Sequence, residues 1–550
     1  MQECHQLFIE VQMQGVFADG KTFVDSIAKR DPALIREQYE VERQRPDFSL
    51  RHFVLDNFHL PEDAASDFRP DPQHDVLQNI EALWPHLTRR ARAPADVRER
   101  DSLLSLPDHY VVPGGRFREI YYWDSYFTLL GLLDGGHRPL AESMVRNLAY
   151  LIDHHDHVPN GNRSYFLSRS HPPVFYKMVE ATAVDTAAQA FLRYLPQLKR
   201  EHAYWMAGSD TLDRGEAVRH VVRLPDGALL NRYWDERDSP RDEMYKDDVL
   251  TALHSPRPHG ELFRDIRAAA ESGWDFSSRW NADPHDLGTI ETTAILPVDL
   301  NCLLHGLESA ISIGCAEGGD ETGRLIYQAK AYARQAAIDR YFWSEALGHY
   351  VDYHWVRRRQ LSALTVATVL PLFTGVASQD QAEKVAASVS GGLLMPYGMA
   401  TTTVRSGQQW DLPNGWAPHH WMAVEGLTRY GCTALAREIA VRWIGTVDRI
   451  YRETGKLLEK YDVTALQAGG GGEYPTQDGF GWTNGVTATL MKRYPNALAQ
   501  AGRIEPFSVG DTVQPEGPSA PVPTPPPMLP GSLAAHLVPP SPVAVPSVGL

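Results

Sequence analysis

The chain has 550 residues and a mass of 61.6 kDa, with 43% hydrophobic and 22% charged residues, which is typical of a folded globular protein. Its formal net charge of -16 argues against nucleic acids and anionic membrane surfaces as partners, because both require a basic surface. The four cysteines form no CxxC pair and no cluster with histidine, so neither a zinc site nor a disulfide framework is predicted.

The first part of the chain, residues 1–105, is polar and charge-rich, with scattered apolar anchors such as Phe8, Phe23 and Trp84. We expect it to form an N-terminal arm on the main body. Its beginning lacks the basic segment followed by an apolar segment that marks an export signal. No apolar run reaches the roughly 20 residues of a membrane span, so we expect no membrane partner.

A run of aromatic, charged and glycine residues, PGGRFREIYYWDSYF, follows at 113–127. Aromatic faces can lie against the C–H side of a pyranose, and carboxylates and arginines make charge-assisted hydrogen bonds to sugar hydroxyl groups. Glycine lets the backbone approach a ligand closely. This composition favours a sugar-binding surface over an ordinary core element.

Segments with helical periodicity recur from about 106 to 500, between connectors rich in Gly, Pro and Trp. A clear case is the apolar i,i+4 row at 435–447, which Gly455 is expected to end. Strand-like alternation is confined to short pieces such as 219–223. The sequence therefore predicts one mainly α-helical domain at 106–500.

Two conspicuous polar motifs come directly before predicted helices. QWDLPNGWAP (409–418) leads into a helix at Pro418, and GFGWTNG (479–485) offers Thr483 and Asn484 as helix caps. We expect such loops to converge on one pocket. This arrangement fits a toroid of paired helices with its site at one end of the ring.

The last stretch, residues 501–550, departs from this pattern. Residues 515–550 contain twelve prolines, and no Lys or Arg follows Arg503. Such a segment forms neither helix nor sheet ladders, so we interpret it as a disordered, polyproline-like tail without a catalytic role.

Hydrolysis of a glycosidic bond needs a protonated carboxylic acid beside the leaving oxygen and a second carboxylate that activates water or attacks directly. Candidates are acidic residues flanked by aromatic residues and glycines, and spacing alone does not rank them. Asp124 and Asp411 have a second interpretation as helix caps. The candidates are Asp124, Asp275, Asp411, Glu459 and Glu473.

The motifs at 113–127 and 409–418 resemble the two signature motifs of the trehalases of glycoside hydrolase family 37. The glycine run and EYPTQDGFGWTNGV at 469–486 are similar to the C-terminal motif of that family, and the resemblance extends from about residue 8 to about residue 495. It implies an all-α (α/α)6 barrel that hydrolyses α,α-trehalose to two glucose molecules. The implied mechanism is inverting and uses no metal or organic cofactor.

Carried over by position, the resemblance places the general acid on Asp275 and the general base on Glu459. Inversion requires these carboxyl groups to stand roughly 6.5–9.5 Å apart. The glycines at 469–472 are interpreted as a flap that closes over the disaccharide. The substrate-binding positions of the family fall on Arg116, Trp123, Asp124, Asn160, Arg169, Ser170, Arg241, Glu243, Gly273 and Glu473.

A nearby cation favours the ionised form of a carboxyl group, which suits a base and harms an acid. We therefore expect Arg116, Arg169 and Arg241 to lie closer to Glu459 than to Asp275. Without the resemblance, Arg241 and the nearby Glu243 would be interpreted as an ordinary surface ion pair.

The chain departs from the family pattern at a few places. His171 and Asp242 stand where the family commonly has Gln and Pro, and the flap is one residue shorter. Histidines such as His154 and His419 lack a recurring carboxylate spacing, so no metal site is predicted.

Two other functions stay open. One is a hydrolase or phosphorylase that acts on another glucoside in a similar helical barrel, and the other is a trehalose-binding protein without activity. We expect a monomer whose partner is the disaccharide. The likeness to exported bacterial trehalases favours the periplasm, with the cytoplasm as the alternative because no signal peptide is visible.

Overall fold

This computed structural model describes residues 5–61, 68–91 and 101–501. Within these residues, six helices form a closed inner ring. Each helix contacts the next, and the last contacts the first. The predicted tail at 502–550 lies outside the described residues. In ring order the helices are α6 (Tyr122–Asp134), α8 (Phe175–Ala181), α13 (Val298–Glu317), α15 (Leu370–Thr374), α17 (Ala417–Arg429) and α19 (Gly481–Arg493).

A second set of helices covers this ring from outside. The outer helices are α5 (Val76–Leu87), α7 (Arg138–His155), α10 (Leu195–Trp205), α14 (Glu321–Tyr341), α16 (Gln379–Gly392) and α18 (Thr433–Thr454). Contacts join α7 to α6, α14 to α13, α18 to α17 and α5 to α19, while α10 contacts both α7 and α13. The all-α class and the (α/α)6 toroid predicted from the sequence are confirmed.

The remaining helices lie between or beside these layers: α1 (His5–Met13), α2 (Lys21–Val24), α3 (Pro32–Glu42), α4 (Leu50–Asn57), α9 (Ala187–Arg193), α11 (Tyr245–Leu253), α12 (His259–Ser272) and α20 (Ala497–Ala501). None of the described helices has both the length and the apolar character needed to cross a membrane.

The strands are two or three residues long and form small antiparallel sheets. The two-stranded sheets pair β1 (Ile27–Ala28) with β2 (Phe58–His59), β3 (Thr88–Arg89) with β4 (Tyr110–Val111), β9 (Trp343–Ser344) with β10 (His349–Tyr350), and β13 (Leu394–Met395) with β14 (Gly398–Met399). The three-stranded sheets are β5 (Glu216–Val218), β6 (Val221–Arg223) and β7 (Leu229–Asn231); β8 (Ile295–Leu296), β11 (Tyr353–His354) and β12 (Arg359–Gln360); and β15 (Asn414–Gly415), β16 (Tyr461–Asp462) and β17 (Gln467–Ala468).

Side-chain burial explains which helices are inner. Helix α6 is buried continuously from Tyr122 to Leu132, and α13 is buried around most of its circumference. Helices that are buried all round need neighbours on every side. Outer helix α14, in contrast, buries a narrow stripe that includes Ala331, Ala337 and Ile338. The inner ring is therefore the core of the domain.

The loops that precede four of the inner helices meet at one pocket. Residues just before α6, α8, α17 and α19 line a common pocket. Strand β15 pairs with β16 through Asn414 opposite Asp462 and Gly415 opposite Tyr461. The signature segment 409–418 is thereby held beside the loop that carries Glu459.

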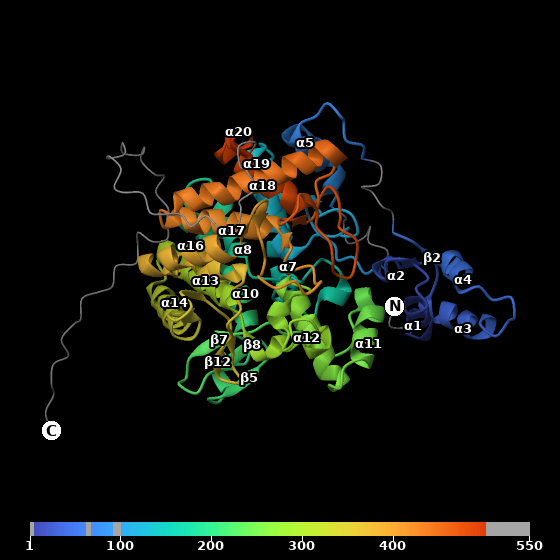
Figure 1. Cartoon of the computed structure of the whole chain (residues 1–550). Coiled ribbons are helices and arrows are strands. Elements are labelled where there is room, and N and C mark those ends of the chain that lie inside the picture. The colour runs from blue at the N-terminus through green and yellow to red at the C-terminus, as the bar shows by residue number, and fades with distance from the viewer. Residues whose placement is uncertain (1–4, 62–67, 92–100, 502–550) are drawn as a thin grey trace, which may run out of the picture.

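The first helices, α1 to α4, form an arm (residues 5–61) with its own apolar cluster. Tyr165 and Tyr245 of the main body pack against this cluster, and Figure 1 shows the arm projecting from one side. Helix α5 instead buries Ile80 and Trp84 in the main core. The domain boundary at residue 105 stays a prediction. The cluster comprises Leu7, Phe8, Val11, Phe23, Val24, Ile35, Tyr39, Phe53, Val54 and Phe58.

Gly455 ends α18 as predicted, with φ of 71°. The prediction that Thr483 and Asn484 cap α19 was wrong. Helix α19 begins at Gly481, so Thr483 and Asn484 lie inside its first turn and do not cap it. The Thr483 hydroxyl group donates to the carbonyl oxygen of Leu458 at 2.7 Å. This side chain therefore ties the helix to the loop of Glu459.

Two glycines allow α6 and α19 to approach each other closely. A Cβ atom on Gly131 would stand 2.5 Å from the Cα atom of Gly485. A Cβ atom on Gly485 would stand 2.1 Å from the backbone oxygen of Phe127. Neither position has room for a side chain unless the two helices move apart.

We expect Gly485→Ala to lower the free energy of unfolding by about 2 kcal/mol or more, because backbone atoms cannot yield as a flexible side chain can. The measurement is thermal or urea unfolding followed by circular dichroism. Gly391→Ala is the control, since a Cβ atom at this exposed position in α16 meets nothing within 4 Å. Equal unfolding midpoints for the two variants would contradict the close packing of α6 and α19.

Candidate active site

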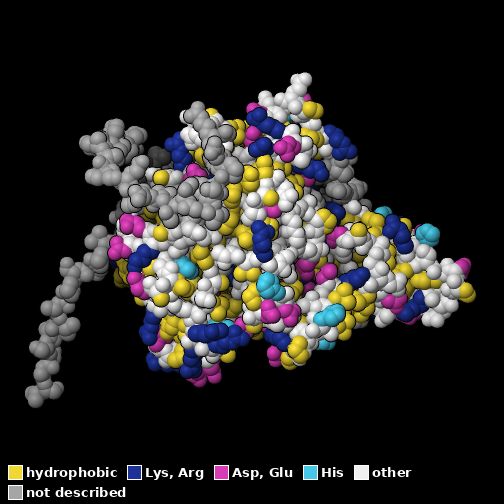
Figure 2. Space-filling view, in the orientation of Figure 1, with side chains coloured by type: hydrophobic (Ala, Val, Ile, Leu, Met, Phe, Trp, Pro, Cys, Tyr) yellow, Lys and Arg dark blue, Asp and Glu magenta, His cyan; other side chains and the backbone are white. Residues whose placement is uncertain are grey.

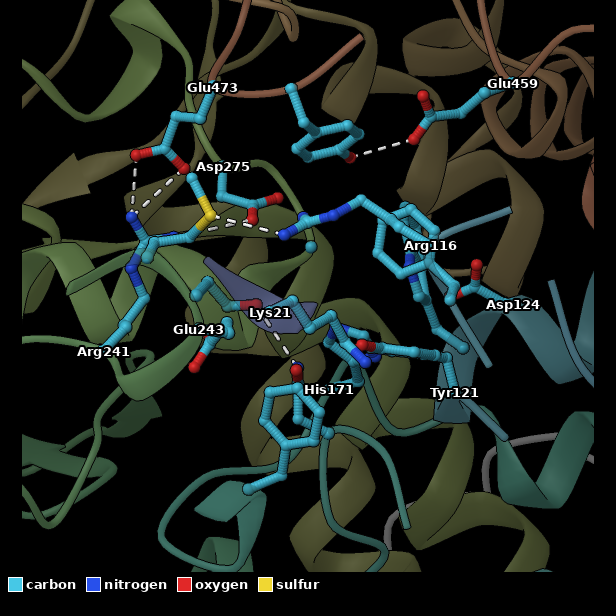
Figure 3. A pocket seen from close by; sticks show the side chains of 18 of the residues that line it. Lys21, Arg116, Tyr121, Asp124, His171, Arg241, Glu243, Asp275, Glu459 and Glu473 are labelled. Atoms are coloured by element: carbon cyan, nitrogen blue, oxygen red, sulfur yellow. Dashed lines mark hydrogen bonds and ion pairs between the residues drawn. The ribbon is translucent and has the colours of Figure 1, made fainter. Parts of the chain in front are cut away.

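A pocket lies where the loops before α6, α8, α17 and α19 meet, and it is lined by both candidate catalytic carboxyl groups, Asp275 and Glu459. Figure 3 shows Asp275 beside Arg241 and Glu473, with Glu459 on the opposite side. The predicted substrate-binding residues that line the pocket are Arg116, Trp123, Asp124, Asn160, Arg169, Arg241, Glu243, Gly273 and Glu473.

Ser170 is buried behind the pocket wall. Its backbone N–H donates to Glu271 at 2.8 Å, and its carbonyl oxygen accepts a hydrogen bond from the Asn160 side chain at 3.0 Å. Asn160 itself lines the pocket. Ser170 thus contacts a lining residue without being part of the lining.

Asp275 follows the C-terminal end of α12. Gly273 ends this helix with φ of 76°, and a Cβ atom there would stand 2.9 Å from the ring of Trp123. The side chain of Asp275 is 30% exposed, toward the pocket. Burial raises its pKa to about 6, against the opposing charges of Arg241 and Arg169. Asp275 therefore keeps a proton at mildly acidic pH, as a general acid must.

The signature segment 409–418 holds the loop of Asp275 in place. The side-chain amide of Gln409 donates to the carbonyl oxygen of Asp275 at 2.5 Å. Asp411 is fully buried and accepts hydrogen bonds from hydroxyl groups of the loop after Asp275 and of its own loop. Its role is therefore structural. It does not cap the following helix, α17, which begins only at Ala417. The donors are Ser277, Ser278, Thr402 and Ser406.

Glu459 lies on a separate loop, and its side chain is 1% exposed. One carboxylate oxygen accepts a hydrogen bond from the Tyr474 hydroxyl group at 2.9 Å, and the other lies 3.2 Å from the Lys460 ammonium group. Lys460 also donates to the side-chain oxygen of Gln409 at 2.7 Å. Because Gln409 contacts the loop of Asp275 as well, one side chain connects the surroundings of both carboxyl groups.

The expectation that all three pocket arginines lie closer to Glu459 than to Asp275 is wrong for Arg241. Its Nη1 atom lies 3.9 Å from Oδ2 of Asp275. The positive charge beside Glu459 comes from Lys460 instead. Arg241 lies on the side of Asp275, where the carboxylates of Asp248 and Glu473 compensate its buried charge.

Each pocket arginine has carboxylate partners of its own. The pairs are Arg116 with Asp19 (2.8 Å), Arg169 with Glu243 (2.7 Å), and Arg241 with Asp248 (2.6 Å) and Glu473 (2.8 Å). The interpretation of Arg241 and Glu243 as a surface ion pair was therefore wrong, because both are buried and each has another partner.

The arginines affect Glu243 and Glu473, two of the glutamates that line the pocket, differently. Burial opposes the ionisation of Glu243, but the charges of Arg169, Arg241 and Arg267 outweigh it and lower the pKa to about 2. Burial dominates at Glu473 and raises its pKa to about 7, although Arg241 opposes this. Glu243 is thus a firmly ionised acceptor, whereas Glu473 titrates near neutrality.

Aromatic rings make up much of the pocket wall. The ring centroid of Trp123 lies 5.8 Å from that of Trp410 and 5.9 Å from that of Trp482. The guanidinium group of Arg116 lies 4.5 Å from the ring centroid of Tyr474. Such a wall can stack against a sugar ring while the charged groups bind its hydroxyl groups.

Several lining residues were not predicted. Most are aromatic residues of the motifs quoted above, so the signal was present in those segments. Lys21 comes from the arm, and its surrounding sequence gave no indication of a site. The unpredicted lining residues include Lys21, Phe117, Tyr121, Phe166, Met244, Trp410, Tyr474, Phe480 and Trp482.

The two residues that differ from the family pattern, His171 and Asp242, have different surroundings. His171 lines the pocket, and burial together with the charge of Arg169 lowers its pKa well below the usual range. The carboxylate of Asp242 pairs with Arg237 at 2.6 Å. His171 is therefore a neutral group that can bind substrate, whereas the side chain of Asp242 is occupied by Arg237.

The arrangement combines a carboxyl group with a raised pKa, a second carboxylate, paired arginines and aromatic walls in one pocket. This set can protonate a leaving oxygen and activate a water molecule. Within residues 5–61, 68–91 and 101–501, no group of three or more His, Cys, Asp or Glu side chains is placed to hold a metal ion.

Comparison with known proteins finds a matching family model, related sequences and a related solved structure for this chain. A family model described as trehalase matches residues 15–495. The periplasmic trehalase of Pseudomonas aeruginosa is 52% identical over 491 residues, 89% of each chain, and that of Xanthomonas axonopodis pv. citri is 52% identical over 90% of this chain and 87% of its own. The solved structure of the neutral trehalase of Saccharomyces cerevisiae matches with a TM-score of 0.59 and 26% identity, over 79% of this chain and 82% of that chain.

Proposed function

The chain belongs to the trehalase family, and on this premise we propose that Asp275 is the general acid and Glu459 the general base of an inverting α,α-trehalase. The enzyme is a glycoside hydrolase that converts α,α-trehalose and water into two glucose molecules. The observation that carries the assignment is that Asp275 and Glu459, the positions indicated by the family resemblance, face one pocket, where burial raises the pKa of Asp275 and Lys460 lies 3.2 Å from Glu459.

In the proposed reaction, the Asp275 carboxyl group donates its proton to the glycosidic oxygen as the bond to the anomeric carbon breaks. The Glu459 carboxylate takes a proton from a water molecule, whose oxygen attacks that carbon from the opposite face. One glucose leaves with its α configuration unchanged, and the other forms as the β anomer. The two carboxyl groups end with exchanged protonation states, which solvent restores.

The paired arginines and acidic residues of the pocket are proposed to bind the sugar hydroxyl groups. A guanidinium group already oriented by a carboxylate keeps further N–H donors in a fixed direction, which reduces the entropy lost on binding. We assign this role to Arg116, Trp123, Asp124, Asn160, Arg169, Ser170, Arg241, Glu243, Gly273 and Glu473. Ser170 acts by holding Asn160.

The glycines at 469–472 are proposed to act as a flap. Gly471 and Gly472 have φ of 78° and 81°, a conformation that favours glycine. The Asn414 side chain binds the backbone of Gly470 on both sides, donating to its oxygen at 2.7 Å and accepting from its nitrogen at 3.2 Å. Because the following residue, Glu473, pairs with Arg241, movement of the flap would open the pocket on this side.

We propose that the enzyme works in the periplasm, as the names of its relatives indicate for them, and that it is a monomer without nucleic-acid partners. Figure 2 shows basic side chains interspersed with acidic ones over the face presented, a distribution that does not favour a polyanion. Activity confined to the cytoplasmic fraction, or a solution mass well above 61.6 kDa, would contradict these assignments.

We expect Asp275→Asn and Glu459→Gln each to lower kcat for trehalose by about 10²- to 10⁴-fold, since each removes one proton transfer. Glucose release is the measurement. Asp283→Asn, the same chemical change at an exposed loop position, is the control and should keep kcat within about twofold of the unmutated enzyme. Near-full activity in either pocket variant would refute its assigned role.

Stereochemistry tests the inverting mechanism directly. Proton NMR spectra recorded before the anomers interconvert should show α- and β-glucose forming in equal amounts from trehalose. A retaining mechanism would release the α anomer alone.

The pKa of Asp275 predicts the alkaline side of the pH profile. Asp275 is protonated below pH about 6 and loses its proton above it, so kcat/KM should fall as the pH rises through this value. At higher pH the decline should approach about tenfold per pH unit, because only the protonated fraction reacts. A kcat/KM that stays constant up to pH about 8 would show that Asp275 does not limit the reaction as an acid.

A further inference from the structure

The arm reaches the sugar pocket, although its apolar cluster is separate from the core of the ring. The carboxylate of Asp19 binds the guanidinium group of Arg116 through two parallel hydrogen bonds, Nε to Oδ2 and Nη2 to Oδ1, each 2.8 Å long. Lys21, two residues further, lines the pocket itself. A segment almost one hundred positions away in the sequence thus contacts a substrate-binding side chain.

We propose that Asp19 is a positioning residue of the trehalose site, which holds Arg116 between the arm and the loop of the general base. The inference rests on the proposed function, because the binding role of Arg116 is part of that function. It adds the arm to the machinery of the reaction, as a component that acts through Arg116.

Arg116 connects Asp19 to the surroundings of Glu459. Its guanidinium group lies over the ring of Tyr474, whose hydroxyl group donates to Glu459 at 2.9 Å. Its backbone N–H donates to the side chain of Gln477 at 2.8 Å, and the carbonyl oxygen of Gln477 accepts from the backbone N–H of Glu459 at 2.9 Å. A guanidinium group released by Asp19 would therefore loosen contacts that orient both the sugar and the base.

The arm holds the Asp19 carboxylate in a fixed place. The backbone N–H of Lys21 donates to Oδ1 of Asp19 at 2.9 Å. The ammonium group of Lys21 forms buried ion pairs with Asp25 at 2.5 Å and with Glu119 of the 113–127 motif at 2.7 Å. The arm is thus anchored to the pocket wall directly beside Arg116.

A second anchor joins the arm to the opposite side of the pocket. The Gln12 side chain donates to the carbonyl oxygens of Gly20 at 3.0 Å and Asp242 at 3.3 Å. Asp242 lies between Arg241 and Glu243, two lining residues. With Lys21 on one side and Gln12 on the other, Asp19 has little freedom to move away from Arg116.

The ion pair with Arg116 also keeps the carboxyl group of Asp19 ionised. Burial opposes its ionisation, but the hydrogen bonds and charge of Arg116 outweigh burial and lower its pKa. The Arg116 side chain is only 8% exposed, so without this carboxylate its buried charge would lack its close partner. Such a guanidinium group would turn toward another acceptor and lose its alignment with the sugar.

The test uses the full-length enzyme with Asp19→Asn, which keeps the size of the side chain but removes its charge. We expect kcat/KM for trehalose to fall by about 10- to 100-fold, the scale of a misplaced binding group, in an enzyme whose thermal unfolding midpoint is lowered but stays above the assay temperature. Asp31→Asn is the matched control, because Asp31 is exposed on the same arm as the N-cap of α3 and Asn caps helices equally well. It should keep kcat/KM within twofold of the unmutated enzyme.

A double-mutant cycle with Arg116→Lys separates positioning from general support of the fold. If Asp19 acts through Arg116, adding Asp19→Asn to Arg116→Lys should cost less than threefold in kcat/KM. The proposal would be overturned if the loss of kcat/KM in the double variant equalled the product of the two single losses. It would also be overturned if Asp19→Asn alone kept kcat/KM within twofold of the unmutated enzyme. If Asp19→Asn does not fold, Asp19→Ser, which also removes the charge but keeps a polar group, takes its place in the same cycle with the same criteria. An unmutated enzyme that releases no glucose from trehalose would refute the proposed function itself, and so the two failures are distinguishable.

Discussion

The pairing of each pocket arginine with a carboxylate of its own is the constraint on which the site depends. A free guanidinium group beside Asp275 would stabilise its ionised form and remove the proton that the reaction needs. Arg241 lies only 3.9 Å from Asp275, yet its charge is shared with Asp248 and Glu473. Burial then dominates at Asp275, and the pocket combines strong binding groups with an acid whose pKa is about 6.

The helical ring determines how distant segments meet. The loops before four of its inner helices, α6, α8, α17 and α19, converge on one pocket although they are far apart in the chain. The signature segment 409–418 lies between two of these loops. Through Gln409 it contacts the carbonyl oxygen of Asp275 on one side and Lys460, the neighbour of Glu459, on the other. This position explains why a motif without a catalytic carboxylate accompanies the catalytic site.

Much of the pocket could be predicted because its residues lie in motifs of unusual composition. Arg116, Trp123 and Asp124 were identified within one run of rings, charges and glycines, and the structure places all three in the pocket wall. Asp19 and Lys21 could not be found in this way. Their segment resembles ordinary polar sequence, and their partners are about one hundred positions away.

The sequence by itself determined the family, the helical fold class and the residues that we assign to catalysis and sugar binding, because long motifs and helical periodicity are properties of neighbouring residues. Only the tertiary structure decided which charge compensates which: Arg241 lies beside Asp275, Lys460 lies beside Glu459, and the arm reaches Arg116. The physical reason is that charge interactions and desolvation depend on distance and burial in space. The distances between charges and the burial of each charge arise when separate loops meet, and no local pattern of residues encodes these two quantities.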